Sequence, residues 1–275
     1  MSRRFAPLSA LLLVAALAAA CATRTLPGIE GPPASAAMRS ELLSALAERE
    51  ASAWSLRGTA TVTVSARGQR RRFREAFAIE AGGRLRLEQY EWTGLATMIL
   101  ASDGEAVAAH LPFARQFLRG RATPENLARL TGLPVAPGVL TRLLLGLPPL
   151  RVDPVRATVL SASGAPGGPA VAVISERDGT AQALRFTPGT FFLEEGELSE
   201  GGQPLVRFRF GPAERLDGLL VARSLTLWHL PEGVEIAVAF DALELNARLD
   251  AGLFSLAVPA DAGVRIEDLD RPDRP

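Results

Sequence analysis

The strongest constraint on the fold is an alternation of apolar and polar residues that starts at Trp54. In the run GTATVTVSA, Ala60, Val62 and Val64 share one face of an extended chain, while threonines occupy the other. The run RRFREAFAIEA continues the pattern and places Phe77 on one face. Because successive side chains of a strand point to opposite faces, this period of two predicts strands with one buried face.

Similar runs follow and are separated by turn-forming segments such as SDGE, RDG, TPG and PEG. They include RLRLEQYEW, TMILASDGEAVAAHL, ATVLSAS, PAVAVISE, AQALRF, TFFLEEGEL, PLVRFRFG, LVARSLTLWHL and VEIAVAFDALEL. About eleven short strands at close spacing predict a mainly β fold built on one curved antiparallel sheet, a half-barrel. We see no internal boundary or repeat, and therefore expect one domain over residues 38–266 and a flexible tail over residues 267–275.

Helical patterns appear in two places. Residues 38–54 have apolar residues at helical spacing, which predicts an amphipathic N-terminal helix. A central helical pair is predicted within residues 123–149, where Thr123 suits an N-cap, Pro124 suits the first helical position, and leucines recur about once a turn. Pro137 starts the second of these helices. The helical pair is either packed core or a lid over an interior space.

The first residues are typical of an exported protein. Arg3 and Arg4 precede the apolar run Ala10–Ala20, which is shorter than the roughly 20 residues that a membrane-spanning helix needs. This pattern predicts a signal peptide over residues 1–20. The only cysteine, Cys21, directly follows small residues. The arrangement resembles the lipobox of bacterial lipoproteins, which implies lipidation of Cys21; an incidental cysteine behind a plain signal peptide is the alternative.

The segment behind this cysteine is rich in Pro, Gly and Ala and predicts a tether over residues 21–37. Ala22 stands where an inner-membrane retention signal would have Asp, which in the enterobacterial pattern implies the outer membrane. A single cysteine also leaves no intrachain disulfide.

Composition and motifs argue against several function classes. The chain has 30 basic and 30 acidic residues, so no global charge attracts it to nucleic acid. His110 and His229 each lie in an apolar, strand-like run, where a structural role is expected. There is no HExxH, GxSxG or Walker sequence and no Cys/His spacing for a metal. We therefore expect no catalytic residue, no metal, no cofactor and no enzymatic activity.

Two turns of the predicted meander have unusual compositions. One carries five arginines and is either a solvated edge whose charge discourages strand addition or a contact with anionic headgroups: Arg67, Arg70, Arg71, Arg72 and Arg74. The other, YEWTGLATM, places Trp92 and Leu95 around Gly94. Such an apolar tip is either buried or offered to a membrane or partner, and the sequence alone favours burial.

Parts of the chain resemble the LolB outer-membrane lipoprotein receptors and, more broadly, the LolA/LolB carriers. ENLARLTGLPVAPGVLTRLLLGLPP is similar to a segment with the pattern LTG-P-P--L---LGLP in that family. WTGLATMIL is similar to the strand pair whose connection carries a protruding apolar loop, with Gly94 at the loop glycine, although Thr93 stands where that loop has leucine. LFSLAVPADAGV looks more like LolA proteins. The resemblance covers about residues 38–264 and is strongest over residues 85–149.

The resemblance implies a half-barrel with a helical lid over a hydrophobic cavity. It further implies an outer-membrane lipoprotein that accepts acylated lipoproteins from a periplasmic LolA-like carrier and helps to insert them into the outer membrane. The expected partners are acyl chains, that carrier and outer-membrane phospholipid, and the expected state is a monomer. The alternative is an envelope lipoprotein that binds another lipid or acts as a sensor or scaffold; a hydrolase with an unrecognised site is more distant.

Three sets of residues are expected to form the site. The cavity lining is predicted from the inward apolar positions, each of which is alternatively solid core: Val62, Val64, Phe77, Leu85, Leu87, Met98, Leu100, Phe208, Phe210, Leu227 and Phe240. The lid is expected to contribute Leu130, Leu140, Leu143 and Leu144. The membrane-insertion loop is expected to consist of Trp92, Gly94 and Leu95.

Overall fold

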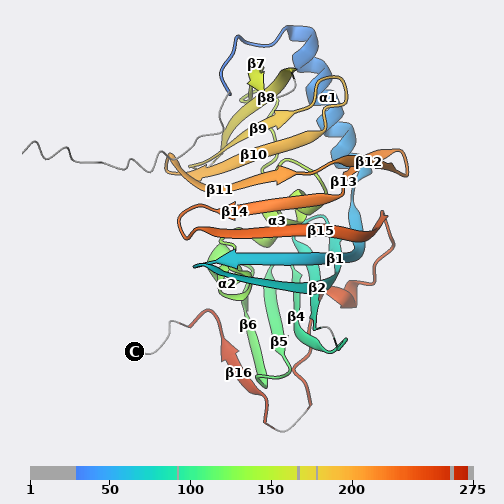
Figure 1. Ribbon diagram of the computed structural model, residues 1–275, viewed down its shortest axis with the longest axis vertical. Coiled ribbons are helices and arrows are strands. Elements are labelled where there is room, and N and C mark those ends of the chain that lie inside the picture. Colours follow the sequence, from blue (N-terminus) through green and yellow to red (C-terminus); the bar gives the residue numbers. More distant parts are fainter. Residues whose placement is uncertain (1–28, 92, 166–167, 178, 261–262, 272–275) are drawn as a thin grey trace, which may run out of the picture.

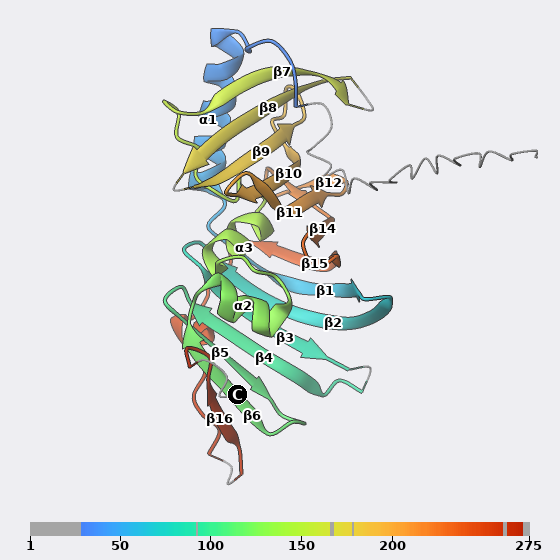
Figure 2. The same cartoon turned by 90° about the vertical axis from the view of Figure 1, so that its left-hand side faces the viewer.

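Fourteen strands form one open, curved sheet in the order β16-β6-β5-β4-β3-β2-β1-β15-β14-β11-β10-β9-β8-β7 (Figure 1). The computed structural model describes residues 29–91, 93–165, 168–177, 179–260 and 263–271. Neighbouring strands are antiparallel except β16 and β6, which are parallel. The sheet is strongly twisted and does not close on itself (Figure 2).

The sheet consists of two meanders that meet at β1. The first contains β1 (Ser55–Ala66), β2 (Gln69–Glu80), β3 (Arg84–Tyr90), β4 (Ala96–Asp103), β5 (Ala106–Leu111) and β6 (Gln116–Arg121). The second contains β7 (Thr158–Ala165), β8 (Gly168–Arg177), β9 (Thr180–Phe186), β10 (Leu193–Glu200), β11 (Gln203–Phe210), β14 (Ser224–His229) and β15 (Val234–Leu245). A small separate hairpin is formed by β12 (Ala213–Leu216) and β13 (Leu219–Ala222), and the short β16 spans Arg265–Asp268.

The predicted alternation is present along β1. Leu56, Ala60 and Val62 are buried, while Arg57 and Thr59 are exposed. β1 pairs with β2 on one side and with β15 on the other, so it joins the two meanders. The buried faces of both meanders therefore belong to one continuous concave surface.

Three α-helices are described: α1 (Ala36–Ser52), α2 (Pro124–Thr131) and α3 (Pro137–Leu144). They lie on the concave side of the sheet (Figure 2). The start of α2 follows the prediction, because the Thr123 hydroxyl accepts a hydrogen bond from the Asn126 N–H at 3.3 Å and Pro124 occupies the first turn. A short 3₁₀ helix, η1 (Ala251–Phe254), contacts β3 and β4. No helix in the described part of the chain is both long and apolar enough to cross a membrane.

The expected strand number of about eleven is too low, because β6 and β16 lack a clear period-two pattern. β6 contains three polar side chains and a glycine and shows little alternation. β16 exists through its parallel pairing with β6, a contact between residues far apart in the sequence. A period-two pattern cannot reveal such strands.

The tail predicted as flexible over residues 267–275 is instead structured as far as residue 271. Its first two residues belong to β16, and Leu269 is buried. The Asp270 carboxylate accepts hydrogen bonds from the Arg121 N–H and from the Asn126 side chain. Residues 272–275 lie outside the described part.

The predicted tether, residues 21–37, is described from residue 29 onward. The Ala34 N–H donates to the Val159 carbonyl at 3.0 Å, and the Ser161 N–H donates to the Pro32 carbonyl at 3.0 Å. Residues 32–34 therefore pair with β7, and α1 starts directly after them. Residues 21–28, including Cys21, lie outside the described part.

The β1–β15 junction leaves no room for a side chain at Gly58. A Cβ at this position would lie 1.9 Å from the Ala242 carbonyl oxygen. We expect Gly58→Ala to lower the free energy of unfolding by roughly 3 kcal/mol, measured by urea denaturation. Gly138→Ala in α3 is the control, because a Cβ there meets open space. A Gly58→Ala chain as stable as this control would contradict the tight junction.

Candidate functional site

A cavity of about 260 Å³ lies between the helical pair (α2 and α3) and the concave face of the sheet. Its wall is mostly apolar and is formed by Val62, Val64, Arg71, Phe73, Glu75, Phe77, Leu87, Gln89, Met98, Leu130, Thr131, Leu133, Leu140, Leu144, Leu227, Ile236, Val238 and Phe240. A concave, mainly apolar site with a few polar groups is typical of a site for a hydrophobic ligand.

Both meanders contribute to the wall because β1 and β15 are neighbours. Phe77 of β2 and Phe240 of β15 meet edge to face, with ring centroids 5.7 Å apart. Leu227 and Ile236 are paired across β14 and β15 and face the same side. The helical pair closes the cavity with Leu140 and other leucines that recur at helical spacing.

The structure brings ten of the fifteen predicted lining and lid residues into this wall: Val62, Val64, Phe77, Leu87, Met98, Leu227, Phe240, Leu130, Leu140 and Leu144. The other five lie in packed core outside it: Leu85, Leu100, Phe208, Phe210 and Leu143.

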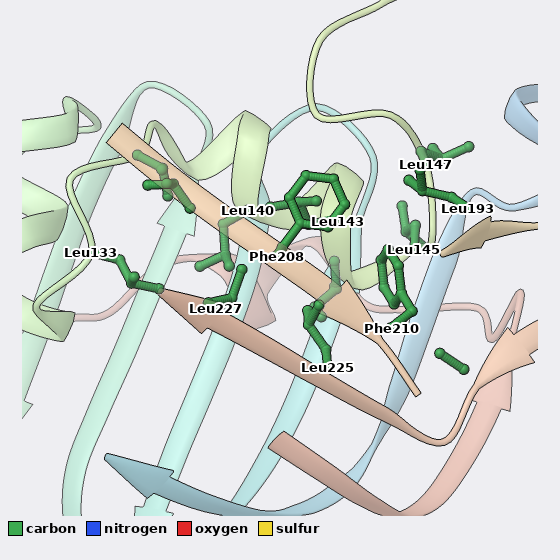
Figure 3. Close-up of a cluster of buried hydrophobic side chains, with 14 of the residues drawn as sticks. Leu133, Leu140, Leu143, Leu145, Leu147, Leu193, Phe208, Phe210, Leu225 and Leu227 are labelled. Atoms are coloured by element: carbon green, nitrogen blue, oxygen red, sulfur yellow. The ribbon is translucent and has the colours of Figure 1, made fainter. Parts of the chain in front are cut away.

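The five outlying residues face the predicted side of their strands or helix, but they lie where side chains fill the space. Phe208 and Phe210 meet edge to face, with centroids 5.8 Å apart. In Figure 3, Leu143 of α3 and Phe208 lie close together among other leucines. Leu85 and Leu100 are fully buried. The assignment of the four strand residues to the cavity wall and of Leu143 to its lid is therefore wrong, because a periodic pattern identifies a face but not where packing along it ends.

Sequence reasoning missed four polar residues of the wall, Arg71, Glu75, Gln89 and Thr131. On β2, Arg71, Phe73, Glu75 and Phe77 are spaced two residues apart and therefore share one face of the strand. The period of two thus indicated that Arg71 and Glu75 face the same side as the two phenylalanines. The charge of the arginines instead suggested a solvated hairpin edge or a contact with anionic headgroups. The apolar wall residues Phe73, Leu133, Ile236 and Val238 were also missed.

Glu75 is the most unusual of these polar residues. Burial raises the pKa of its carboxyl group from 4.5 to about 7. Within the described residues, its side chain has no hydrogen-bonding or ionic partner. A carboxyl group in such surroundings favours its neutral form, so Glu75 adds little charge to the cavity near neutral pH.

Polar contacts fasten the outer end of α2. The buried Asn126 side chain donates to the Asp270 carboxylate at 2.7 Å and to the Arg121 carbonyl at 2.9 Å. Arg129 donates to the Leu269 carbonyl at 3.0 Å and pairs with Glu267 at 3.2 Å. The segment around β16 thus holds α2 in place.

The outer end of α3 is fastened in the same manner. Arg142 pairs with Glu50 of α1 at 2.8 Å and donates to the Pro148 carbonyl at 2.7 Å. Arg49 of α1 donates to the Leu145 carbonyl at 2.9 Å, and burial lowers the pKa of its guanidinium group to about 10. The α1 helix thus holds α3 in place.

The middle of the helical pair is held differently. Residues 132–136 have no polar side chain, and the hydrogen bonds of their backbone stay within the helical pair. Leu133 and Val135 are buried. The middle is therefore held over the cavity by apolar contacts alone.

A second, larger recess of about 1280 Å³ adjoins the cavity. It lies between the β1–β2 hairpin and the β3–β4 connection, and it shares Arg71, Phe73, Glu75 and Gln89 with the cavity wall. Because the two spaces share these residues, the recess borders the cavity wall at this end of the sheet.

The β3–β4 connection presents an apolar side chain to solvent. Leu95 is 56% exposed, so the predicted burial of this tip is wrong for Leu95. Gly94 has a φ of 82°, a conformation that glycine adopts without strain. Trp92, the other apolar residue of the predicted membrane-insertion loop, lies outside the described residues.

The two histidines are not near each other in the sheet. His110 lies on β5 and His229 on β14, in different meanders. Within the described ranges, no three His, Cys, Asp or Glu side chains gather as a metal site.

Comparisons with known proteins identify the fold. No family model matches the chain, and no curated protein matches its sequence. Among solved structures, a DUF1329 family protein from Desulfovibrio piger is 10% identical, with a TM-score of 0.58 over 79% of this chain and 95% of that one.

Two further structures carry names that refer to lipoproteins. A domain from Vibrio parahaemolyticus described as an outer membrane lipoprotein-sorting protein is 12% identical, with a TM-score of 0.57 over 78% of this chain and 97% of that one. A LolA superfamily protein from Nitrosomonas europaea is 12% identical, with a TM-score of 0.51 over 80% of this chain and 98% of that one.

The raised pKa of Glu75 makes stability depend on pH. Between pH 4.5 and about 7 the native state holds a proton that the unfolded state lacks, so stability falls as pH rises through this range. Glu75→Gln should therefore raise the free energy of unfolding by about 3 kcal/mol at pH 8 and change it little at pH 5, measured by urea denaturation. Glu232→Gln on an exposed turn is the control. Equal effects at both pH values would contradict a buried carboxyl group.

At these low identities, the likeness concerns the fold and nothing beyond it. The matches nevertheless cover 78–80% of this chain and at least 95% of the others, so the likeness extends well beyond one motif. The chain therefore has the fold of these solved structures, one of which is a LolA superfamily protein.

Proposed function

We propose that the chain is a LolB-like outer-membrane lipoprotein that accepts acylated lipoproteins from a periplasmic LolA-like carrier and helps to insert them into the outer membrane. The observation that carries the proposal is the apolar cavity closed by a helical pair whose middle is held by apolar contacts alone. Binding is non-covalent and the protein is not an enzyme. Each acyl methylene removed from water contributes about 0.8 kcal/mol, which supplies affinity without catalytic groups.

The fastening of the helical pair suggests how the cavity admits a chain. The outer ends of α2 and α3 stay fixed by Asn126, Arg129, Arg142 and their partners. The middle moves away from the sheet, and the acyl chain replaces the lid leucines as the apolar contact. Because one apolar contact replaces another, opening costs little when a ligand is present.

The remaining parts of the proposal rest on the sequence. Cys21 is the lipidated residue that anchors the monomeric protein to the periplasmic face of the outer membrane. The exposed Leu95, together with Trp92, delivers the cargo to phospholipid.

The second candidate is an envelope lipoprotein that binds another lipid or acts as a sensor or scaffold. Thr93, which stands where the LolB loop has leucine, favours this candidate. Mass spectrometry of molecules that co-purify with the chain separates the two, since phospholipid without any lipoprotein transfer supports the second.

Filling the cavity should weaken ligand binding. Val64→Trp places a large ring in the half-buried wall, and we expect at least tenfold weaker binding of a fluorescent fatty-acyl probe. Val258→Trp, at an exposed position, should bind the probe like the unchanged chain. Circular dichroism confirms that both variants are folded. If a folded Val64→Trp chain bound the probe with full affinity, the cavity would not be the acyl site.

The β3–β4 loop should act after the acyl chain has bound, when the lipoprotein is transferred to the membrane. Trp92→Glu with Leu95→Glu should block transfer of a lipoprotein from carrier to outer-membrane vesicles, because charged side chains resist entry into acyl chains. Binding of the fatty-acyl probe should not change. Val155→Glu is the control, since Val155 is 88% exposed and lies outside the loop. Normal transfer by the double variant would exclude the loop from insertion.

A further inference from the structure

Three connections of the first meander lie at the same end of the sheet. In an antiparallel meander every second connection shares an end, which groups the described residues of β1–β2 (67–68), β3–β4 (91 and 93–95) and β5–β6 (112–115). The arrowheads of β1 and β3 point to the same side in Figure 2. We call these connections, with the first residues of β2 (residues 69–72), the docking end. The recess that borders the cavity wall is lined in part by this end.

Arginines gather at the docking end without carboxylate partners. It contains five arginines and one acid, Glu91: Arg67, Arg70, Arg71, Arg72 and Arg115. In the described part of the chain, none of these arginines forms an ion pair. At the opposite end, Arg84 pairs with Glu80 at 2.7 Å and Arg121 pairs with Asp270 at 3.7 Å. The docking end therefore carries an uncompensated positive charge on a chain with no net charge.

Two large apolar side chains project from the same end. Phe113 at the β5–β6 turn is 62% exposed, and Leu95 is 56% exposed. Turns ordinarily carry polar residues. No sequence pattern around Phe113 had indicated that this side chain would be exposed. An exposed phenylalanine two residues before an unpaired arginine gives this tip an apolar contact and a cationic contact together.

We infer that the docking end binds the surface of an anionic phospholipid bilayer, with Phe113 entering the acyl region and Arg67, Arg70 and Arg115 contacting phosphate groups. A bilayer offers negative charge and an apolar interior within a few ångströms of each other, which matches both kinds of side chain. A purely polyanionic partner such as nucleic acid leaves the apolar tips without a partner.

This docking places the recess next to the membrane, together with Arg71, which the recess shares with the cavity wall. The inference deepens the proposed function, but binding to an empty vesicle needs no lipoprotein cargo and is tested separately.

The test uses a chain that starts at residue 22, which lacks Cys21 and keeps every described helix and strand. Flotation with vesicles of phosphatidylglycerol and phosphatidylcholine is compared with flotation with phosphatidylcholine alone. We expect binding to the anionic vesicles that weakens as salt is added. Equal binding to both vesicle types, or none to either, would overturn the inference.

Two substitutions locate the contact. Phe113→Glu and the pair Arg67→Glu with Arg70→Glu should each weaken binding to anionic vesicles at least tenfold, while Phe113→Leu retains it. The control pair is Arg215→Glu with Arg248→Glu, two exposed arginines outside the docking end. Anionic-vesicle binding that survives both substitutions would also overturn the inference.

The fatty-acyl probe separates this outcome from the proposed function. All these variants should bind the probe normally, because none of the substituted residues lines the cavity. If the unchanged chain binds the probe but not the vesicles, the docking inference is wrong and the proposed acyl site stands. If it binds the vesicles but not the probe, the proposed acyl site is wrong and the docking inference stands.

Discussion

The rest of the structure depends on the pairing of β1 with β15. These two long strands lie near opposite ends of the folded chain, and their ladder runs from Leu56 with Leu245 to Ser65 with Glu235. Without this ladder the two meanders would be separate sheets. Each sheet would then expose its part of the apolar concave surface to solvent. The ladder brings residues of both meanders into one cavity wall, as the contact between Phe77 and Phe240 shows. The close approach at Gly58 lies within the same ladder.

The sequence predicts the direction in which side chains point better than it predicts what they meet. Val62, Val64 and Leu87 follow from alternation alone, since a period of two assigns each residue to a face. Leu85 has the same signal but lies in packed core, because the cavity ends before it along β3. The alternation also puts Glu75 on the face of Phe77, but its side chain is not apolar and so did not mark it as part of a cavity wall. The parallel pairing of β16 gives no local signal, because it depends on residues nearly 150 positions away.

The helical pair combines two kinds of attachment with different sensitivities. Its outer ends rest on partly buried ion pairs and hydrogen bonds, which need fixed geometry and are costly to break one partner at a time. Its middle rests on apolar contacts, which are non-directional and can be exchanged for others. One element is thereby both anchored and displaceable, which a uniformly packed core would not allow. Arg49 and Glu50 of α1, which hold the end of α3, also tie the N-terminal helix to this arrangement.

The pairing of residues 32–34 with β7 and of β16 with β6 has a consequence for solubility. An open sheet has two edge strands whose unpaired backbone groups can recruit strands from other molecules and start aggregation. Here each edge is covered by a segment from one end of the folded chain. The covering segments themselves offer few backbone groups for pairing with another strand, because one contains Pro33 and the other, β16, is very short. The two terminal segments thus cover the sheet edges at which strands of other molecules could otherwise pair and start aggregation.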